Sequence, residues 1–243
     1  SKALRTAAVL VLRRMKNDNI ALFLNDKDEY IVTEAARGIN DDLSIPAALP
    51  ALAATLAETR FTSEPLLRRA INAALRVGSP KELDLLIAFS TRTDIKDNIK
   101  AEALATLGTW GNPSVLDRVD GRSRGSLVRD GALVKTKIQP FIGNFLKETN
   151  AETLVTMASL LSELNITEYN NELANIYNNS DNAKVRAAVL PALNKLKYAE
   201  LEAAIKKGID DKDESVRTVA LSLLNNDNVS KESLPTLVQT IFT

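Results

Sequence analysis

The 243-residue sequence contains no cysteine and no histidine, and it is poor in glycine, proline and aromatic residues. The absence of His and Cys excludes a Ser-His-Asp or Cys-His nucleophile, an ordinary zinc site, a thiol redox centre and His- or Cys-bound haem within this chain. There are nine Gly, eight Pro and 5% aromatic residues, against 35 Leu and 31 Ala. Few turn formers and much Ala and Leu favour many short helices over a β-sandwich or barrel.

The sequence also lacks an excess of charge of either sign and a long apolar run. Its 31 basic and 31 acidic side chains balance, whereas nucleic-acid-binding proteins usually show a basic excess. No apolar run approaches the 18 residues of a membrane span, and there is no signal-peptide-like start. The chain enters a helical pattern directly at Ser1, which favours a mature or excised piece. We therefore predict no nucleic-acid partner and no membrane span.

An internal repeat is the main feature that is present. Seven segments share a pattern with apolar residues at offsets 0 and 4 and, in most of them, 8, which is one face of a helix; they are residues 4–12, 31–39, 67–75, 99–107, 154–161, 185–193 and 216–224. Shorter amphipathic segments lie between them, at 46–58, 80–90, 170–179 and 199–209. The unit is a helix–turn–helix whose apolar face must be buried by stacking on its neighbours.

Helix starts are predicted from capping patterns. An acid or hydroxyl residue with Glu three positions later is typical of an N-cap, and this pattern occurs at Asp26, Ser79, Thr149 and Asp211. Ser79 is followed by Pro80 and Glu82, which fits a capping box with Pro at the first helical position.

The repeat resembles HEAT repeats, in the compact bacterial HEAT-like form of about thirty residues. The most specific element is an apolar residue followed by a base, and these bases are Arg5, Arg68, Lys100, Arg186 and Arg217. Acids lie upstream at Glu64, Asp97, Asp181 and Asp213. The resemblance implies an all-α, right-handed α-α superhelix of about seven helical pairs in one domain, residues 1–243. It also implies a ladder of contacts between these bases and acids, broken where Val32 and Val155 replace the base.

One interruption separates the fourth and fifth segments. Residues 109–131 hold the only Trp, four of the nine Gly and four Arg, and loops longer than about 12–15 residues are often functional. In one interpretation Trp110, Val115 and Leu116 fold back as a plug and the arginines are solvated. In the other, the segment is a docking loop whose binding residues are Trp110, Arg118, Arg122 and Arg124.

Part of this segment resembles a second group of proteins. Leu107, Trp110, Pro113, Asp117, Arg118, Val119, Gly121 and Arg124 fit an L-x-x-W-x-x-P…D-R-V-x-G-x-x-R pattern. It is similar to the repeat region of large exported bacterial proteins that join a β-propeller, HEAT-like repeats and a c-type cytochrome. The resemblance implies a repeat module with no cofactor of its own, in a periplasmic or extracytoplasmic location; without it, a cytoplasmic location is the alternative.

Two functions remain open from the sequence. The first is a non-catalytic protein-binding or spacer module whose partner is another protein or a neighbouring domain of the same polypeptide. The second is a HEAT-fold enzyme of the DNA-glycosylase-like type. The first predicts mixed charge on the inner helices, and the second requires a basic groove around a buried carboxylate.

Overall fold

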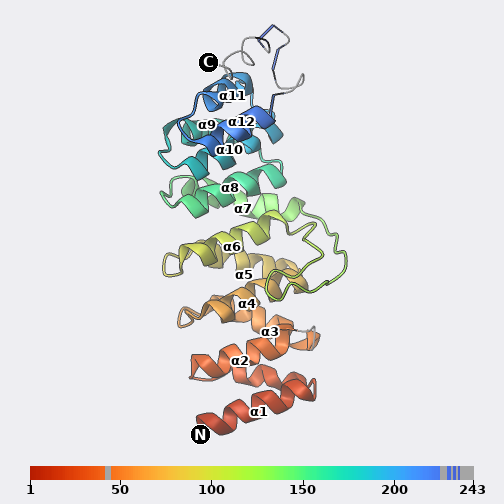
Figure 1. The fold of residues 1–243 in the computed structure, drawn as a ribbon. Helices are drawn as coiled ribbons and strands as arrows, with labels where there is room; N and C mark the ends of the chain where they lie inside the picture. The colour runs from red at the N-terminus through yellow and green to blue at the C-terminus, as the bar shows by residue number, and fades with distance from the viewer. Residues whose placement is uncertain (42–44, 225–228, 231, 234, 236–243) are drawn as a thin grey trace. The chain divides into compact units, whose positions relative to one another are not determined.

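The computed structural model describes residues 1–41, 45–224, 229–230, 232–233 and 235. Within these residues the regular elements are helices, with one isolated β-bridge (Figure 1). In the first half they are α1 (Lys2–Arg14), the 3₁₀ helix η1 (Asp18–Asn25), α2 (Glu29–Asn40), η3 (Pro46–Ala48), α3 (Leu49–Ala54), η4 (Thr55–Ala57), α4 (Glu64–Val77), α5 (Pro80–Ser90) and α6 (Asp97–Gly108). They continue as α7 (Ala132–Phe145), α8 (Ala151–Glu163), α9 (Asn170–Asn179), α10 (Ala183–Lys195), α11 (Leu201–Ile209) and α12 (Glu214–Ser222).

The seven repeated segments correspond to helices α1, α2, α4, α6, α8, α10 and α12. A partner helix precedes each of the last six, and in chain order these partners are η1, α3, α5, α7, α9 and α11. The predicted all-α fold of repeated helical pairs is confirmed. The segment 46–58 departs from a regular helix: α3 is only six residues long and is flanked by the 3₁₀ turns η3 and η4.

The chain divides into two compact units, Ser1–Gln139 and Pro140–Thr243, with the division inside α7. In the first unit α1, α2, α4 and α6 stack one on the next, and α3 and α5 form a second row against them. In the second unit α8, α10 and α12 stack in the same way, α9 packs on α10, and α11 on α12.

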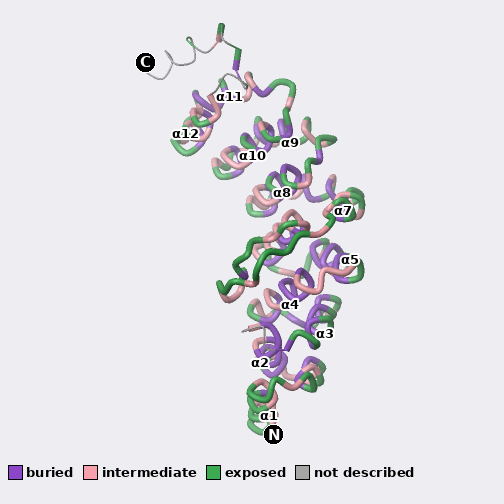
Figure 2. Tube along the Cα trace, turned by 90° about the vertical axis from the view of Figure 1, so that its right-hand side faces the viewer, coloured by how far each residue is buried: buried purple, intermediate pink, exposed green. Residues whose placement is uncertain are grey.

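Small side chains make the stacked helices fit closely. Ala35 and Ala36 of α2 and Ala73 and Ala74 of α4 are fully buried, and Figure 2 shows α2 and α4 as largely buried. An Ala surface lets neighbouring helices approach with little loss of side-chain entropy. The apolar residues that recur along the sequence therefore form the core of each unit.

Three predicted N-caps are wrong by one or two residues. The side chains that accept the first helical N–H groups belong to Asp28 for α2, Asn150 for α8 and Asp213 for α12, in place of the predicted Asp26, Thr149 and Asp211. Asp26 and Asp211 instead accept the N–H of the residue two positions on, and each binds an arginine. The Ser79 cap of α5 is confirmed: its hydroxyl accepts from Lys81 N–H and donates to Glu82.

Three of the five predicted ladder residues pair with acids that follow them in the sequence, in the next helical pair. Arg5 Nε lies 2.7 Å from Asp26, and Arg186 binds both carboxylate oxygens of Asp211 at 2.7 Å. Arg68 lies 2.7 Å from Glu102. Each of these arginines lies on a helix that packs against the next stacked helix, and its acid lies on that next helix or just before it. These three ion pairs are therefore with acids that follow the arginines and not with the upstream acids.

The remaining predicted members of the ladder contribute in other ways. Arg217 Nη1 donates to the backbone oxygen of Asp211 at 2.9 Å, and Lys100 is buried on α6. Of the upstream acids, Glu64 binds Lys96 and Asp213 caps α12. Val32, where the base is missing, is fully buried in the core. Across the described residues, no helix is both long and apolar enough to span a membrane.

Candidate binding site

Residues 109–131, hereafter the α6–α7 loop, form an ordered hairpin beside α4 (Figure 1). Asp117 N–H donates to the Arg122 oxygen at 2.8 Å, and Arg124 N–H to the Val115 oxygen at 2.7 Å. At the base of the hairpin, Arg129 N–H donates to the Gly111 oxygen at 2.8 Å. These hydrogen bonds between the two arms of the hairpin satisfy backbone groups that a long connection would otherwise leave to water. The loop occupies the residues that the sequence predicted.

Trp110 anchors the start of the loop. Its side chain is buried, and the Arg129 guanidinium lies 4.9 Å from the ring centroid. The same guanidinium donates to the Leu75 backbone oxygen at 2.5 Å, close to the end of α4. Trp110 and Arg129 therefore join both ends of the loop to the helical stack.

Asp117 is the centre of a buried polar network. Its side chain is 0% exposed. One carboxylate oxygen accepts from the N–H groups of Val119 and Asp120 at 2.8 and 3.2 Å, and the other from Asn72 Nδ2 and Arg124 Nε at 2.8 and 2.9 Å. Burial works to raise the pKa of Asp117, but the bonds from Val119, Asn72 and Arg124 outweigh it and hold the pKa below its ordinary value.

The network extends from the loop to two helices. Asn72 of α4 also donates to Asn40 Oδ1 of α2 at 2.8 Å. Arg124 reaches Asp120 at 2.5 Å and the Asn40 backbone oxygen at 3.4 Å. A charge-assisted pair with its remaining groups satisfied holds its geometry well. The loop is thus positioned by α2 and α4 and not only by its own ends.

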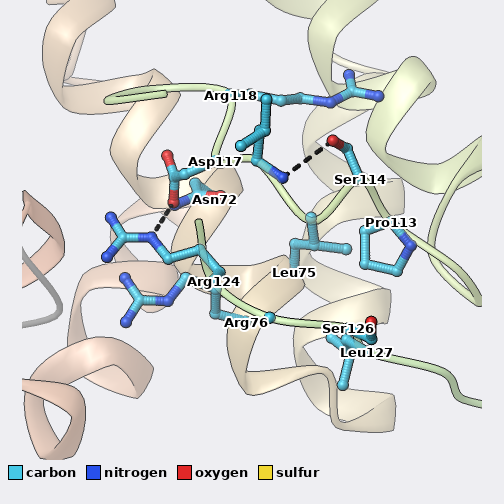
Figure 3. Close-up of a pocket in the computed structure, with 12 residues that line it drawn as sticks. Asn72, Leu75, Arg76, Pro113, Ser114, Asp117, Arg118, Arg124, Ser126 and Leu127 are labelled. Carbon is cyan, nitrogen blue, oxygen red and sulfur yellow. Dashed lines mark hydrogen bonds and ion pairs between the residues drawn. The ribbon is translucent and has the colours of Figure 1, made fainter. Parts of the chain in front are cut away.

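A cavity of about 230 Å³ lies between α4 and the loop (Figure 3). We call it the Arg76 cavity. Its apolar lining comes from Leu75, Pro113, Leu116 and Leu127, and its polar lining includes Asn72, Arg76, Ser114, Asp117, Arg118 and Arg124. Figure 3 shows the guanidinium groups of Arg76 and Arg124 together on one side, with Pro113 and Leu127 on the other.

Arg76 of α4 contributes to this cavity a guanidinium that is hydrogen-bonded to neutral acceptors. Its Nη1 donates to the backbone and side-chain oxygens of Asn40 at 3.1 and 3.4 Å, both neutral acceptors. Burial, and then the neighbouring Arg124, lower the pKa of Arg76, while Asp117 and Asp120 oppose this shift. A hydrogen-bonded anion would further stabilise the charged form of this partly buried guanidinium.

The four predicted binding residues lie in different environments. Trp110 and Arg124 are held inside the structure. Arg122 is exposed at the tip, and exposed Arg118 donates to Thr109 Oγ1 at 3.3 Å and to the Ala105 oxygen at 3.5 Å. The structure therefore leaves Arg118 and Arg122 at the surface.

Half of the plug interpretation is wrong. Trp110 is buried as that interpretation expects, but Val115 and Leu116 are 46% and 53% exposed. The arginines are not all solvated either, because Arg124 is enclosed by Asp117 and Asp120. Val115 pairs with Arg124 and Leu116 with Ser123 within the hairpin, and this pairing leaves both apolar side chains partly exposed.

Sequence reasoning missed the residues that α2 and α4 contribute. Asn40, Asn72 and Arg76 lie inside ordinary repeat helices. The one available signal was Asn72, an amide in the buried stretch of α4 between Ile71 and Ala73. A buried amide needs hydrogen-bond partners, but its sequence position does not say which ones.

Solved structures resemble this fold at low sequence identity. No protein-family model and no curated protein matches the sequence. An engineered protein of solved structure is 13% identical, with a TM-score of 0.49, covering 91% of this chain and 98% of its own. A designed armadillo repeat protein is 14% identical, with a TM-score of 0.46, covering 84% and 97%. The CpcE–CpcF phycocyanin lyase complex of Nostoc sp. PCC7120 is 19% identical, with a TM-score of 0.35, covering 92% of each chain.

Proposed function

We propose that this chain is a non-catalytic module that binds another protein, or a neighbouring domain of the same polypeptide, through the α6–α7 loop. One observation carries the proposal: the loop exposes Val115, Leu116, Leu127 and Val128 on a hairpin that is held in place from below. Val128 is 79% exposed. Apolar side chains presented on a pre-ordered support bind a partner without the entropy cost of ordering a flexible loop.

The charge of the neighbouring helices supports a protein partner. Arg37 lies 2.7 Å from Glu34, Arg69 binds Asp41 through two contacts of 2.9 Å, and Arg68 pairs with Glu102. Such ion pairs give a surface of mixed charge, whereas a groove that binds nucleic acid requires an excess of Lys and Arg side chains without acidic partners. This argues for the binding module over the glycosylase-like enzyme.

The same site supports a non-catalytic role. Asp117 is a buried carboxylate beside Arg76, Arg118 and Arg124, which is the arrangement that the enzyme alternative needs. Its two oxygens, however, already accept four hydrogen bonds, and its pKa is lowered. A general base needs a free lone pair and a pKa near the working pH. Asp117 therefore serves as a structural anchor in this proposal.

A second exposed apolar surface fits a multidomain context. Leu4, Val11 and Met15 of α1 are 72%, 52% and 66% exposed, and Leu22 of η1 is 70% exposed. Helices at the end of a stack bury such faces against a further element. We include in the proposal the repeat region of a propeller–HEAT–cytochrome protein; a propeller and a CxxCH motif encoded in the same gene would support it, and their absence would remove it.

The experiment compares two exposed apolar positions on the same unit. Partners would be cross-linked and recovered from the native host with wild-type chain, Val128→Asp and Leu22→Asp, after equal thermal melting has shown that both variants fold. We expect Val128→Asp to lose at least ten times more of the partner than Leu22→Asp. Loss of the partner with Leu22→Asp alone would place the binding surface on α1 and η1. Failure to recover any specific partner with the wild-type chain would contradict the binding function.

A further inference from the structure

We propose that the Arg76 cavity binds a carboxylate carrying a short branched aliphatic group, as presented by the C-terminal Leu or Val of a partner peptide. This inference rests on the proposed function and deepens it, because it names the chemistry of the partner segment.

The polar side offers an unused guanidinium edge. Arg76 uses Nη1 on the two oxygens of Asn40, and in the part of the chain that the structure describes its Nε and Nη2 make no hydrogen bond. These two nitrogens form the planar fork that matches both oxygens of a carboxylate. Arg124, whose guanidinium lies beside that of Arg76 in Figure 3, adds a second positive charge.

The acids of the loop do not occupy this fork. Both oxygens of Asp117 are taken by backbone N–H groups, Asn72 and Arg124, and Asp120 lies 2.5 Å from Arg124 Nη2. Asp117 and Asp120 favour the charged form of Arg76 through space, but among the described residues neither of them makes a hydrogen bond to it. The carboxylate of a ligand can therefore take the remaining edge of the Arg76 guanidinium.

The apolar side selects what the carboxylate is attached to. Leu75, Pro113, Leu116 and Leu127 line the cavity, and Figure 3 shows Pro113 and Leu127 on the side away from the guanidinium groups of Arg76 and Arg124. Its volume of about 230 Å³ exceeds the roughly 150 Å³ that holds a benzene molecule in a protein core. That space accommodates a carboxylate with one branched aliphatic side chain. A phosphate would place charged oxygens against these apolar groups and lose their contribution.

The mouth of the cavity fits a chain terminus more than a free small molecule. Ser114, Gly125 and Ser126 line it and are exposed, and the exposed Val128 follows directly. The residues before a C-terminal Leu would run over these positions. A peptide should therefore bind more tightly than its last residue alone.

The test uses the full chain and four probes: N-acetyl-leucine, its uncharged amide, a blocked tetrapeptide ending in Leu, and inorganic phosphate. Binding is followed by calorimetry and by the fluorescence of Trp110, the single tryptophan. A 12-atom ligand of ordinary efficiency has a Kd on the order of 1 mM. We expect that value for N-acetyl-leucine, binding at least tenfold weaker for the amide, and at least tenfold tighter for the tetrapeptide.

Three variants locate the site. Arg76→Met should weaken N-acetyl-leucine binding at least tenfold, and Arg122→Met, an exposed arginine outside the cavity lining, should leave it unchanged. Leu127→Glu places a negative charge at a partly exposed wall position, so it should weaken binding even if Arg76→Met fails to fold.

Several results would overturn the inference. Equal binding of N-acetyl-leucine and its amide would show that the carboxylate is not recognised. Competition by phosphate at equal concentration would show that the aliphatic group does not contribute to selectivity. Equal affinity for the tetrapeptide and for N-acetyl-leucine would assign the cavity to a free metabolite. If partner recovery depends on Val128 but no probe binds, the Arg76 cavity is rejected as the binding site and the proposed function stands. If the probes bind but no partner is recovered, the cavity stands as a carboxylate site and the proposed function is rejected.

Discussion

At the scale of single residues, the structure is held by arginines that reach from one repeat to the next. Arg186 is 5% exposed and binds Asp211 of the following repeat through two contacts of 2.7 Å. The side-chain bond from Arg186 is the main cause that lowers the pKa of Asp211, and burial opposes it. Burial, and to a smaller extent the Asp211 carboxylate, raise the pKa of Tyr177 to about 12.

A lowered pKa of Asp211 makes the stability of the second unit depend on pH. The folded state binds fewer protons than the unfolded state, so this contribution is present above the unfolded pKa of about 4 and is lost as the pH falls through the folded pKa. We expect Asp211→Asn to reduce the free energy of unfolding by about 3 kcal/mol at pH 7, because it leaves Arg186 without its partner. The difference from wild type should shrink in denaturant titrations repeated near pH 3.

A matched control separates the pair from general charge effects. Asp181 is an exposed acid upstream of Arg186, at the position that the repeat pattern predicted for the partner. Asp181→Asn should change the free energy of unfolding by no more than about 0.5 kcal/mol. An equal loss with both variants would contradict the assignment of Asp211 as the partner.

At the scale of elements, the end of α4 and the base of the α6–α7 loop are coupled. Gly78 caps α4 with a φ of 67°, in the left-handed region that favours glycine. A Cβ at Gly78 would lie 1.4 Å from Arg129 Nη1. The glycine thus provides both the turn and the room in which Arg129 reaches the Leu75 oxygen and the Trp110 ring.

Gly78→Ala should therefore destabilise the first unit by more than the ~1 kcal/mol of an alanine in left-handed backbone, because Arg129 must also leave its place. The measurement is chemical denaturation followed by Trp110 fluorescence, which should shift as the cation leaves the ring. Gly121→Ala in the same unit is the control, since Gly121 has a φ of 70° and a Cβ there meets no atom within 4 Å. It should cost no more than about 1 kcal/mol, and a similar loss in both variants would contradict this coupling.

At the scale of the whole molecule, the chain consists of two compact units, and repeat proteins pass stability mainly between neighbours. Trp110→Ala removes a buried ring from the first unit and should cost about 3–5 kcal/mol there. Hydrogen exchange should show faster opening of α4 to α6, with α9 to α12 unchanged. Arg186→Met should give the opposite pattern. Uniform loss of protection along the chain in either variant would contradict independent units.

The repeat architecture was available from the sequence because it depends on local patterns. Apolar residues three or four apart lie on one helix face whatever the surroundings, so the seven repeated segments became seven helices. The start and end of the α6–α7 loop were also predictable, since the helical pattern stops at Thr109 and resumes at Ala132. Cap positions were less certain, because Asp26 and Asp28 can each accept a backbone N–H.

The contacts that make the site were decided only by the tertiary structure. Arg124 meets Asn40 across 84 residues, and Asp117 meets Asn72 across 45. The choice of Asp211 over Asp181 as the partner of Arg186 likewise follows from the packing of α10 against α12, since Asp211 lies just before α12. Such pairings depend on the position of one helix along the next, to within a few ångströms. That position is set by the packing of all the helices of the unit. For this reason the sequence determined the elements, and their packing determined the cavity that Arg76 lines.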